Sequence, residues 1–262
     1  MQGKPLVISQ LSIVYITLNA EQYLQESLLA SQQLTDDILL VDSGSTDNTL
    51  AIAEQLHVSI IQQDWLGFSA QKQLAIENAM HDWVLFLDAD EVLSANAIVE
   101  IQQLFQQPLQ AQAYSLPREN WFQGKWIRHG SWWPDRVVRL VDRTQGKMKP
   151  VKVHESWQTE GQVMQLNEPI RHYSYQNYSE LIIKADKYST LGAEQLFAKG
   201  KRSQGWEPLT HAIASFIRLF VLKGGFKDGI EGAAIAYTTA LASFMKYAKL
   251  QELQRTVASK KK

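Results

Sequence analysis

The sequence contains no cysteine among its 262 residues. This absence excludes a disulfide, a thiolate metal site and a cysteine nucleophile. Disulfide-free chains are typical of reducing compartments, so we expect the protein to be cytoplasmic.

Long hydrophobic segments are also missing. The first residues, MQGKPLVISQLSIVYITLN, lack the basic region, long apolar run and small-residue cleavage site of a signal peptide. The apolar runs near the carboxyl terminus do not reach the roughly 18 uncharged residues that a transmembrane helix needs. We therefore expect neither secretion nor a membrane-spanning helix.

Three common catalytic and nucleotide-binding motifs do not occur. There is no Gly-x-x-x-x-Gly-Lys-Ser/Thr loop, which argues against a phosphate-loop nucleotidase. No Gly-x-Gly-x-x-Gly follows the first predicted strand, so the usual mark of dinucleotide binding is missing. The absence of Gly-x-Ser-x-Gly weakens the case for a serine hydrolase.

The formal charge is only −1, but it is unevenly distributed. Residues 1–170 hold 11 Lys and Arg against 20 Asp and Glu, whereas residues 171–262 hold 15 against 7. A basic half joined to an acidic half suggests that the second half meets an anionic surface. The alternative is a charge-complementary contact between the two halves.

Apolar strand-like runs alternate with helical patterns over the first 90 residues. We predict strands at residues 11–18, 38–41, 58–61 and 83–87, and helices at residues 19–33, 48–56 and 68–80. Short loops between alternating strands and helices are typical of an α/β fold with a mostly parallel sheet covered on both faces.

Three carboxylates lie within four residues where the fourth predicted strand ends, in Asp88-Ala89-Asp90-Glu91. Neighbouring carboxylates repel unless a cation lies among them, so the segment is either a solvated strand exit or a cation site. If the extended conformation persists through Asp90, Asp88 and Asp90 point the same way and form a two-oxygen claw. Hard oxygen ligands favour Mg²⁺ or Mn²⁺ with a diphosphate-bearing substrate.

Aromatic and basic residues gather between residues 114 and 157. Five of the eight tryptophans lie there, interleaved with several arginines. Flat rings and guanidinium groups suit sugars and phosphates, so we expect ligand contacts from this segment.

The chain beyond residue 180 is predicted to be helical. Apolar residues recur at helical spacing in residues 209–222 and 237–248. These stripes indicate either a small helical bundle that packs on the sheet or a pair of interfacial helices steered by lysines and arginines to a membrane.

Four segments in order, SIVYITLNAE, ILLVDSGSTDNT, GFSAQKQLAIENAMHDWVLFLDADE and HESW, resemble the family 2 inverting glycosyltransferases of the GT-A fold. Further segments, GSWWPDRVVRLVDR, IRHYSY and GFKDGIEG, resemble the branch that adds glucose to the heptose of the lipopolysaccharide inner core. The resemblance implies a Rossmann-like GT-A domain over residues 1–178, with a donor part to about residue 110 and an acceptor part after it. A basic, helical, membrane-associating extension then covers residues 179–262.

The resemblance also implies roles for individual residues. The nucleotide-sugar would contact Thr17, Asn19, Glu21, Asp42, Ser43, Ser45, Lys72 and Asp88, with Asp42 accepting the uracil imide hydrogen. Asp90, with Asp88 and His172, would hold Mg²⁺ or Mn²⁺. Acceptor contacts would come from Arg118, Trp132, Trp133, Arg136 and Trp157. The sequence departs from the family pattern at Tyr15, where many relatives carry Pro, and at Gln73, where they carry Asn.

The catalytic base is predicted to be Glu155, with Asp135 as the alternative. His154 and His172 could complete the metal shell, although a histidine satisfied by local hydrogen bonds is commoner. The expected activity is transfer of glucose from UDP-glucose to a lipid-linked surface glycan on the inner face of the cytoplasmic membrane, without a nucleic-acid partner. Alternatives are a transferase of another surface polysaccharide, a nucleotidyltransferase with the same metal chemistry, and a non-catalytic carbohydrate-binding protein.

Overall fold

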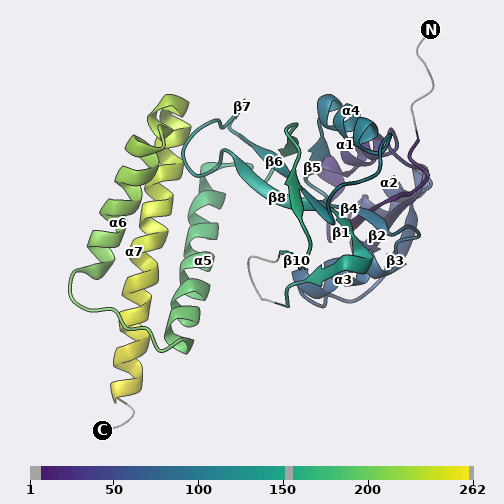
Figure 1. Cartoon of the computed structure of the whole chain (residues 1–262). Helices are drawn as coiled ribbons and strands as arrows, with labels where there is room; N and C mark the ends of the chain where they lie inside the picture. The colour runs from purple at the N-terminus through teal and green to yellow at the C-terminus, as the bar shows by residue number, and fades with distance from the viewer. Residues whose placement is uncertain (1–6, 151–155, 260–262) are drawn as a thin grey trace. The chain divides into compact units, whose positions relative to one another are not determined.

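The computed structural model describes residues 7–150 and 156–259 (Figure 1). The chain forms two compact units. Unit 1 comprises Met1–Glu119 and Asp135–Tyr173, and unit 2 comprises Asn120–Pro134 and Ser174–Lys262. The predicted domains divide the chain at residue 178, whereas the second unit also takes residues 120–134.

Unit 1 is built on a mixed sheet in which the strand order is β3-β2-β1-β4-β8-β6-β12-β5. The first four of these strands are parallel, and β8 runs antiparallel to both β4 and β6. The strands are β1 (Leu11–Thr17), β2 (Ile38–Asp42), β3 (Ser59–Gln62), β4 (Trp83–Asp88), β5 (Glu91–Leu93), β6 (Ala113–Phe122), β8 (Asp135–Asp142), β11 (Val163–Gln165) and β12 (Ile170–His172). A separate two-stranded sheet pairs β9 (Gly146–Met148) with β10 (Trp157–Thr159).

Helices cover both faces of this sheet. They are α1 (Glu21–Ser31), α2 (Thr49–Gln55), α3 (Phe68–Glu77), α4 (Ala95–Leu104) and the short 3₁₀ turn η1 (Arg143–Gln145). The α/β fold class predicted from the sequence is thus confirmed, and every strand and helix predicted before residue 90 has its counterpart in the structure.

The core of unit 1 lies in two layers, one on each side of the sheet. On β1, Ile13 and Tyr15 belong to one cluster and Val14 to the other, as expected for a strand whose side chains alternate between two buried faces. Helices α1, α2 and α4 pack on the first layer, and α3 packs on the second. Both faces of the central strands are therefore mainly apolar, and the carboxylates Asp42 and Asp88 lie at the ends of β2 and β4.

The condition for aligning Asp88 with Asp90, an extended conformation through Asp90, is not met. β4 ends at Asp88, Ala89 and Asp90 form a turn, and β5 begins at Glu91. The physical reason is that β5 pairs with β12, so the chain must leave the line of β4 before Glu91 can enter the new pairing. Asp88 and Asp90 therefore lie on a strand end and in a turn, and do not form a pair on one extended strand.

Unit 2 consists mainly of helices. They are α5 (Tyr178–Ala198), α6 (Glu207–Phe216), the π-helical η2 (Ile217–Leu222), the 3₁₀ turn η3 (Gly225–Asp228) and α7 (Gly229–Ser259), joined by the end of β6 and by β7 (Lys125–Trp126). Phe122, Ile127, Leu181 and Ile235 form its buried cluster. Within the described residues no single helix has the length and hydropathy of a membrane span, whereas Glu207–Leu222 and Gly225–Val257, bent by 69°, meet both criteria as a pair.

Candidate functional site

The end of β2 is organised around the Asp42 carboxylate. Its Oδ1 accepts the backbone N–H groups of Gly44 and Ser45 at 2.9 and 2.8 Å, and its Oδ2 accepts the hydroxyls of Thr17 at 2.8 Å and Ser45 at 2.5 Å. Asp42 is fully buried. The four bonds fix the loop after β2. In this loop Gly44 has a φ of 90°, a backbone angle that residues other than glycine rarely adopt.

A second set of hydrogen bonds ties this loop to the end of β1. Asn19 donates its backbone N–H to Ser45 Oγ at 2.9 Å and accepts the Thr46 N–H at 2.8 Å through its side chain. Its φ of 51° is tolerated better by asparagine than by most residues. Glu21 accepts from Asn48 through both the backbone N–H and the side-chain amide, at 3.0 and 2.7 Å. Of the predicted donor residues, Thr17, Asn19, Asp42 and Ser45 thus form one network, and Glu21 bonds Asn48 after the same loop.

The end of β4 is neutralised by cations. Lys72 Nζ lies 2.7 Å from Asp88 Oδ1, and Arg139 Nη2 lies 2.7 Å from Asp88 Oδ2. Burial alone would raise the pKa of Asp88, but the charges of Lys72 and Arg139 outweigh it and hold this pKa far below the ordinary value of 3.8. Asp88 therefore stays ionised.

Glu91 completes the acidic run and is fully buried. Its Oε1 lies 2.7 Å from Arg139 Nη2 and 3.3 Å from Arg118 Nη1, and its Oε2 accepts the backbone N–H of Asp88 at 3.1 Å. Arg118 also donates two bonds to Asp135 Oδ2, at 3.0 and 2.6 Å. The cations that the acidic run requires thus come from α3, β6 and β8.

Asp90 has a different environment. Its carboxylate lies 3.6 Å from His172 Nε2, and its side chain is 40% exposed. Burial pushes the pKa of Asp90 up, but the hydrogen bond and the charge of His172 bring it below the ordinary value. The backbone oxygen of Asp90 accepts the Tyr173 N–H at 3.0 Å, which holds the turn beside β12.

The cluster is suited to a divalent cation. Within the described residues it combines four carboxylates with three permanent cations, so one negative charge remains when His172 is neutral: Asp88, Asp90, Glu91 and Asp135 against Lys72, Arg118 and Arg139. Among residues 7–150 and 156–259, no three His, Asp or Glu side chains form a preformed metal cage. Asp90 and His172 fit an ion that takes most of its ligands from substrate and water, as Mg²⁺ usually does.

The predicted acceptor residues are spread over several environments. Arg136 is exposed and donates to the Leu166 carbonyl at 2.8 Å, while Trp157 is only 7% exposed and lies in a core cluster. Trp132 and Trp133 belong to unit 2, where the Trp132 ring stacks on Tyr175 with centroids 4.8 Å apart. Glu155 and His154 lie outside the described residues.

Arg139 and Gln71 were not predicted as site residues, and Glu91 was predicted only as a member of the acidic run. Gln71 Nε2 donates to Ser43 Oγ at 3.0 Å and so holds the residue after Asp42. Arg139 could have been found from the sequence, because it is a cation within the apolar strand DRVVRLVD. A buried arginine requires an anionic partner, so its position predicts a nearby carboxylate. The identity of that partner could not be read from local sequence.

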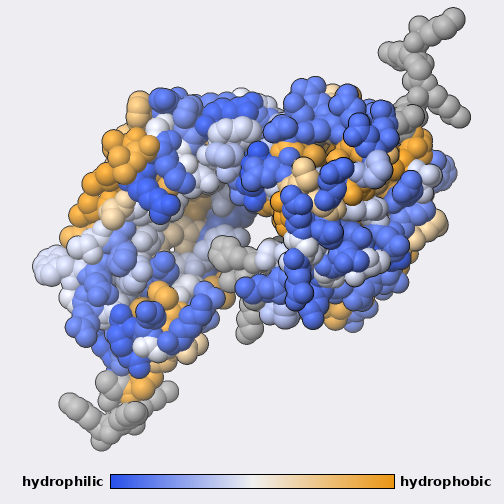
Figure 2. All heavy atoms as spheres, in the orientation of Figure 1, coloured by the Kyte–Doolittle hydropathy of each residue, from blue (hydrophilic) through white to orange (hydrophobic). Residues whose placement is uncertain are grey.

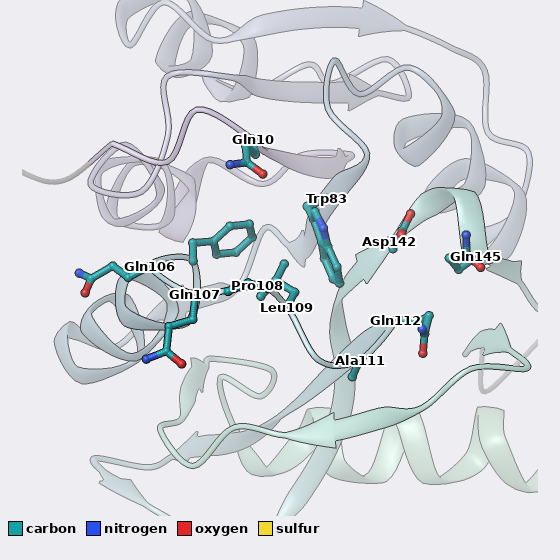
Figure 3. A pocket seen from close by; sticks show the side chains of 11 residues that line it. Gln10, Trp83, Gln106, Gln107, Pro108, Leu109, Ala111, Gln112, Asp142 and Gln145 are labelled. Carbon is teal, nitrogen blue, oxygen red and sulfur yellow. The ribbon is translucent and has the colours of Figure 1, made fainter.

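A cavity of about 600 Å³ lies elsewhere in unit 1, near the start of β4 (Figure 3). Figure 3 shows Trp83 between Pro108 and Leu109 on one side and Asp142 on the other. No lysine or arginine lines the cavity, and it shares no residue with the carboxylate cluster. It is therefore poorly suited to a diphosphate.

The chain is similar to several known proteins. The model of the family described as "Glycosyl transferase family 2" matches residues 12–161. A Rickettsia felis protein named as a glycosyltransferase is 30% identical, over 94% of this chain and 90% of its own. The lipopolysaccharide core biosynthesis glycosyltransferase LpsC of Rhizobium meliloti is 29% identical, over 92% of each chain. The crystal structure of S. aureus TarS 1-349 with UDP-GlcNAc gives a TM-score of 0.49 at 13% identity and covers 94% of this chain and 92% of that one.

Proposed function

Since the chain belongs to glycosyl transferase family 2 and is a glycosyltransferase, we propose that it transfers glucose from UDP-glucose to a lipid-linked bacterial surface glycan such as the lipopolysaccharide inner core. The observation that carries this proposal is the cluster of carboxylates and cations at the end of β4, which is separated from β2 and its Asp42 loop by β1 alone. Membership of the family sets aside the nucleotidyltransferase and the non-catalytic alternatives.

The donor nucleotide would bind at the ends of β1, β2 and β4. Thr17, Asn19, Glu21, Ser43 and Ser45 would line the nucleoside pocket. Asp42 was predicted to accept the uracil imide, but its four internal hydrogen bonds support a different role, in which it shapes the loop that meets the base. Lys72 and Asp88 would lie toward ribose and diphosphate.

Asp90 and His172 would hold Mg²⁺ or Mn²⁺, with Asp88 nearby. The ion would stabilise the negative charge that develops on the leaving diphosphate. The residual negative charge of the cluster and the partial exposure of Asp90 support this assignment. His172 supports it further, because its ring lies beside the Asp90 carboxylate.

Inversion requires attack on the anomeric carbon from the side opposite the diphosphate. The acceptor hydroxyl oxygen forms the new bond to this carbon, the bond to the diphosphate oxygen breaks, and a carboxylate accepts the hydroxyl proton. We assign the carboxylate to Glu155. Asp135 is the alternative, although its bonds from Arg118 favour a structural role, because a carboxylate paired with arginine is a weaker base.

The acceptor assignment rests on the lipopolysaccharide-branch segments and on the similarity to LpsC. Arg118, Trp132, Trp133, Arg136 and Trp157 are the proposed acceptor-side residues. A lipid-linked acceptor would place the enzyme in the cytoplasm, peripherally on the inner face of the membrane. Another bacterial surface polysaccharide is the alternative acceptor.

A panel of UDP-sugars tests the proposal directly. We expect UDP-glucose to raise the thermal unfolding temperature most, and to be hydrolysed slowly, only with Mn²⁺ or Mg²⁺ present. Protection by a different UDP-sugar would change the donor assignment. Equal protection with and without a divalent ion would remove the metal from the proposal.

A further inference from the structure

One face of unit 2 exposes an unusual amount of apolar surface. It runs along α6 and η2, around the turn, and onto the first residue of α7 that follows Gly229. We call it the α6–α7 face, and it comprises Leu209 (41% exposed), Ile213 (50%), Ile217 (46%), Val221 (52%), Leu222 (76%), Phe226 (53%) and Ile230 (69%). Figure 2 shows hydrophobic side chains gathered over the end of α6 and the start of α7, at the upper left.

The spacing of these residues shows that they form a continuous stripe. Leu209, Ile213, Ile217 and Val221 follow one another at intervals of four, so they lie above one another on the helix. Leu219, by contrast, is buried. Soluble proteins rarely leave a contiguous apolar surface of this kind uncovered, and such surfaces mark sites of interaction.

The turn that carries the most exposed residues has a fixed shape. Asp228 is buried and accepts the His129 backbone N–H at 2.8 Å and the His129 Nδ1–H at 3.0 Å, while Lys125 Nζ donates to the Asp228 carbonyl at 2.6 Å. Gly232 lies so close to the Gly225 carbonyl that an added Cβ would stand 1.9 Å from its oxygen. Leu222 and Phe226 are thus held outward by a braced turn.

The exposed charges along η2 and the turn are positive, whereas Asp228 is buried and Glu231 pairs with Lys125. Residues 208–227 contain three cations and no Asp or Glu. Arg218, Lys223 and Lys227 are exposed, and the two lysines flank Phe226 in the turn. An apolar stripe bordered by cations is complementary to a bilayer with anionic headgroups, which offers acyl chains below a negatively charged surface.

We propose that the α6–α7 face docks this enzyme on an anionic lipid bilayer. Val221, Leu222, Phe226 and Ile230 enter the boundary between headgroups and acyl chains, and Lys223 and Lys227 remain among the phosphates. The inference deepens the proposed function, because a lipid-linked acceptor would be met at that surface.

Vesicle sedimentation tests the docking face. The probes are vesicles of phosphatidylcholine alone and vesicles containing phosphatidylglycerol, at low and high salt. We expect the wild-type protein to bind the anionic vesicles and to be partly released by salt. The double variant Leu222→Glu/Phe226→Glu should bind about tenfold less or weaker still, because two carboxylates would enter the bilayer boundary. Met80→Glu is the matched control, since Met80 is 72% exposed but lies in unit 1.

A second variant separates charge from apolar contact. Lys223→Gln/Lys227→Gln should bind anionic vesicles several-fold less and show a weaker salt dependence, while its far-ultraviolet circular dichroism stays that of the wild type. Equal binding to neutral and anionic vesicles, or equal loss in Met80→Glu, overturns the proposal. It is also overturned if the wild-type protein ignores vesicles and sediments as a dimer that Leu222→Glu/Phe226→Glu dissociates, because the face is then a subunit interface. UDP binding, measured on the same samples, reports separately on the proposed function.

Discussion

Asp42 and Asp88 end the two strands that flank β1, yet their carboxylates are satisfied in opposite ways. Asp42 pairs in register with Thr17 and Asp88 with Ile16, so the two lie on either side of β1 and one residue apart along it. The partners of Asp42 are neutral hydroxyl and backbone donors. The partners of Asp88 are the cations Lys72 and Arg139.

This difference separates a carboxylate that shapes the backbone from one that belongs to an electrostatic site. The neutral donors of Asp42 come from Thr17 on β1 and from the loop after β2, so they join the two strand ends and Asp42 fixes geometry. Cations held by several elements can also balance a phosphate or share a carboxylate with a metal, so the end of β4 can respond to a ligand. Variants at each strand end should therefore affect different measurements.

The largest effect is expected on the rate of sugar transfer, from a variant at the end of β4. Asp90→Asn should reduce transfer by about 10⁴-fold or more, because a neutral amide cannot hold the ion that offsets the charge on the leaving group. Mn²⁺ should also cease to strengthen UDP binding, as measured by calorimetry. Asp82→Asn is the control, since Asp82 is 65% exposed and pairs with Arg143 at the other end of β4. Full activity of the wild-type enzyme in excess EDTA would refute the metal role.

The proposed catalytic base lies at neither strand end, so replacing it should leave the affinity for the donor unchanged. Glu155→Gln should slow transfer by roughly 10²-fold to 10⁴-fold while UDP affinity remains near the wild-type value. Single-turnover rates and calorimetry measure the two effects. If Glu155→Gln remains active and Asp135→Asn does not, the base is Asp135.

A smaller effect, on the stability of the fold, is expected from a variant at the end of β2. Asp42→Asn should lower the free energy of unfolding by about 3 kcal/mol, because an amide nitrogen would face N–H and hydroxyl donors in a buried site. Urea unfolding measures the loss, and Asp36→Asn, on an exposed residue, is the control. If the free energy of unfolding is unchanged and UDP binding is abolished, Asp42 contacts the uracil base of the donor, as first predicted.

Lys72→Gln, at the end of β4, should lower the free energy of unfolding by about 2 kcal/mol at pH 7. The loss is limited because Asp88 keeps Arg139 as a partner. The folded-state pKa of Asp88 lies below its ordinary value of 3.8, so its ionisation contributes stability that is present above pH 3.8 and is lost as the pH falls. With one cation fewer the pKa is lowered less, and the variant should lose stability less steeply than the wild type below about pH 4. Urea unfolding at pH 7, 5 and 3.5 tests this, and parallel curves would contradict it.

The smallest effect is expected in the interior of β1, between the two strand ends. The Tyr15 hydroxyl bonds Ser27 at 2.8 Å and Ser31 at 2.7 Å, and burial raises its pKa to about 12. Tyr15→Phe should cost about 1 kcal/mol at pH 7. Because the folded-state pKa is raised, the wild-type protein loses stability as the pH rises from 10 through 12, whereas the variant should lack this contribution. Thermal unfolding at pH 8 and 11 would show the difference.

The first 90 residues were predictable because their signals are local. Apolar runs of strand length, turn residues after Asp42 and the helical pattern before Trp83 each determine structure within a few residues. The turn at Asp90 was not predictable, because it depends on pairing between β5 and β12, which are far apart in sequence. Arg118, Arg139 and His172 reach the acidic run from later strands for the same reason. The full internal bonding of Asp42 required knowledge of the loop geometry.

The pairing of β5 with β12 also sets an order of assembly during synthesis. Of the described cationic partners of the acidic run, only Lys72 precedes it in the chain, and His172 emerges 82 residues after Asp90. At 5–20 residues per second, the nascent chain carries these carboxylates for roughly 4 to 16 s before the last partner leaves the ribosome. The acidic run therefore has only Lys72 as a cationic partner at first, and the Asp90–His172 contact has to wait until β12 has been synthesised.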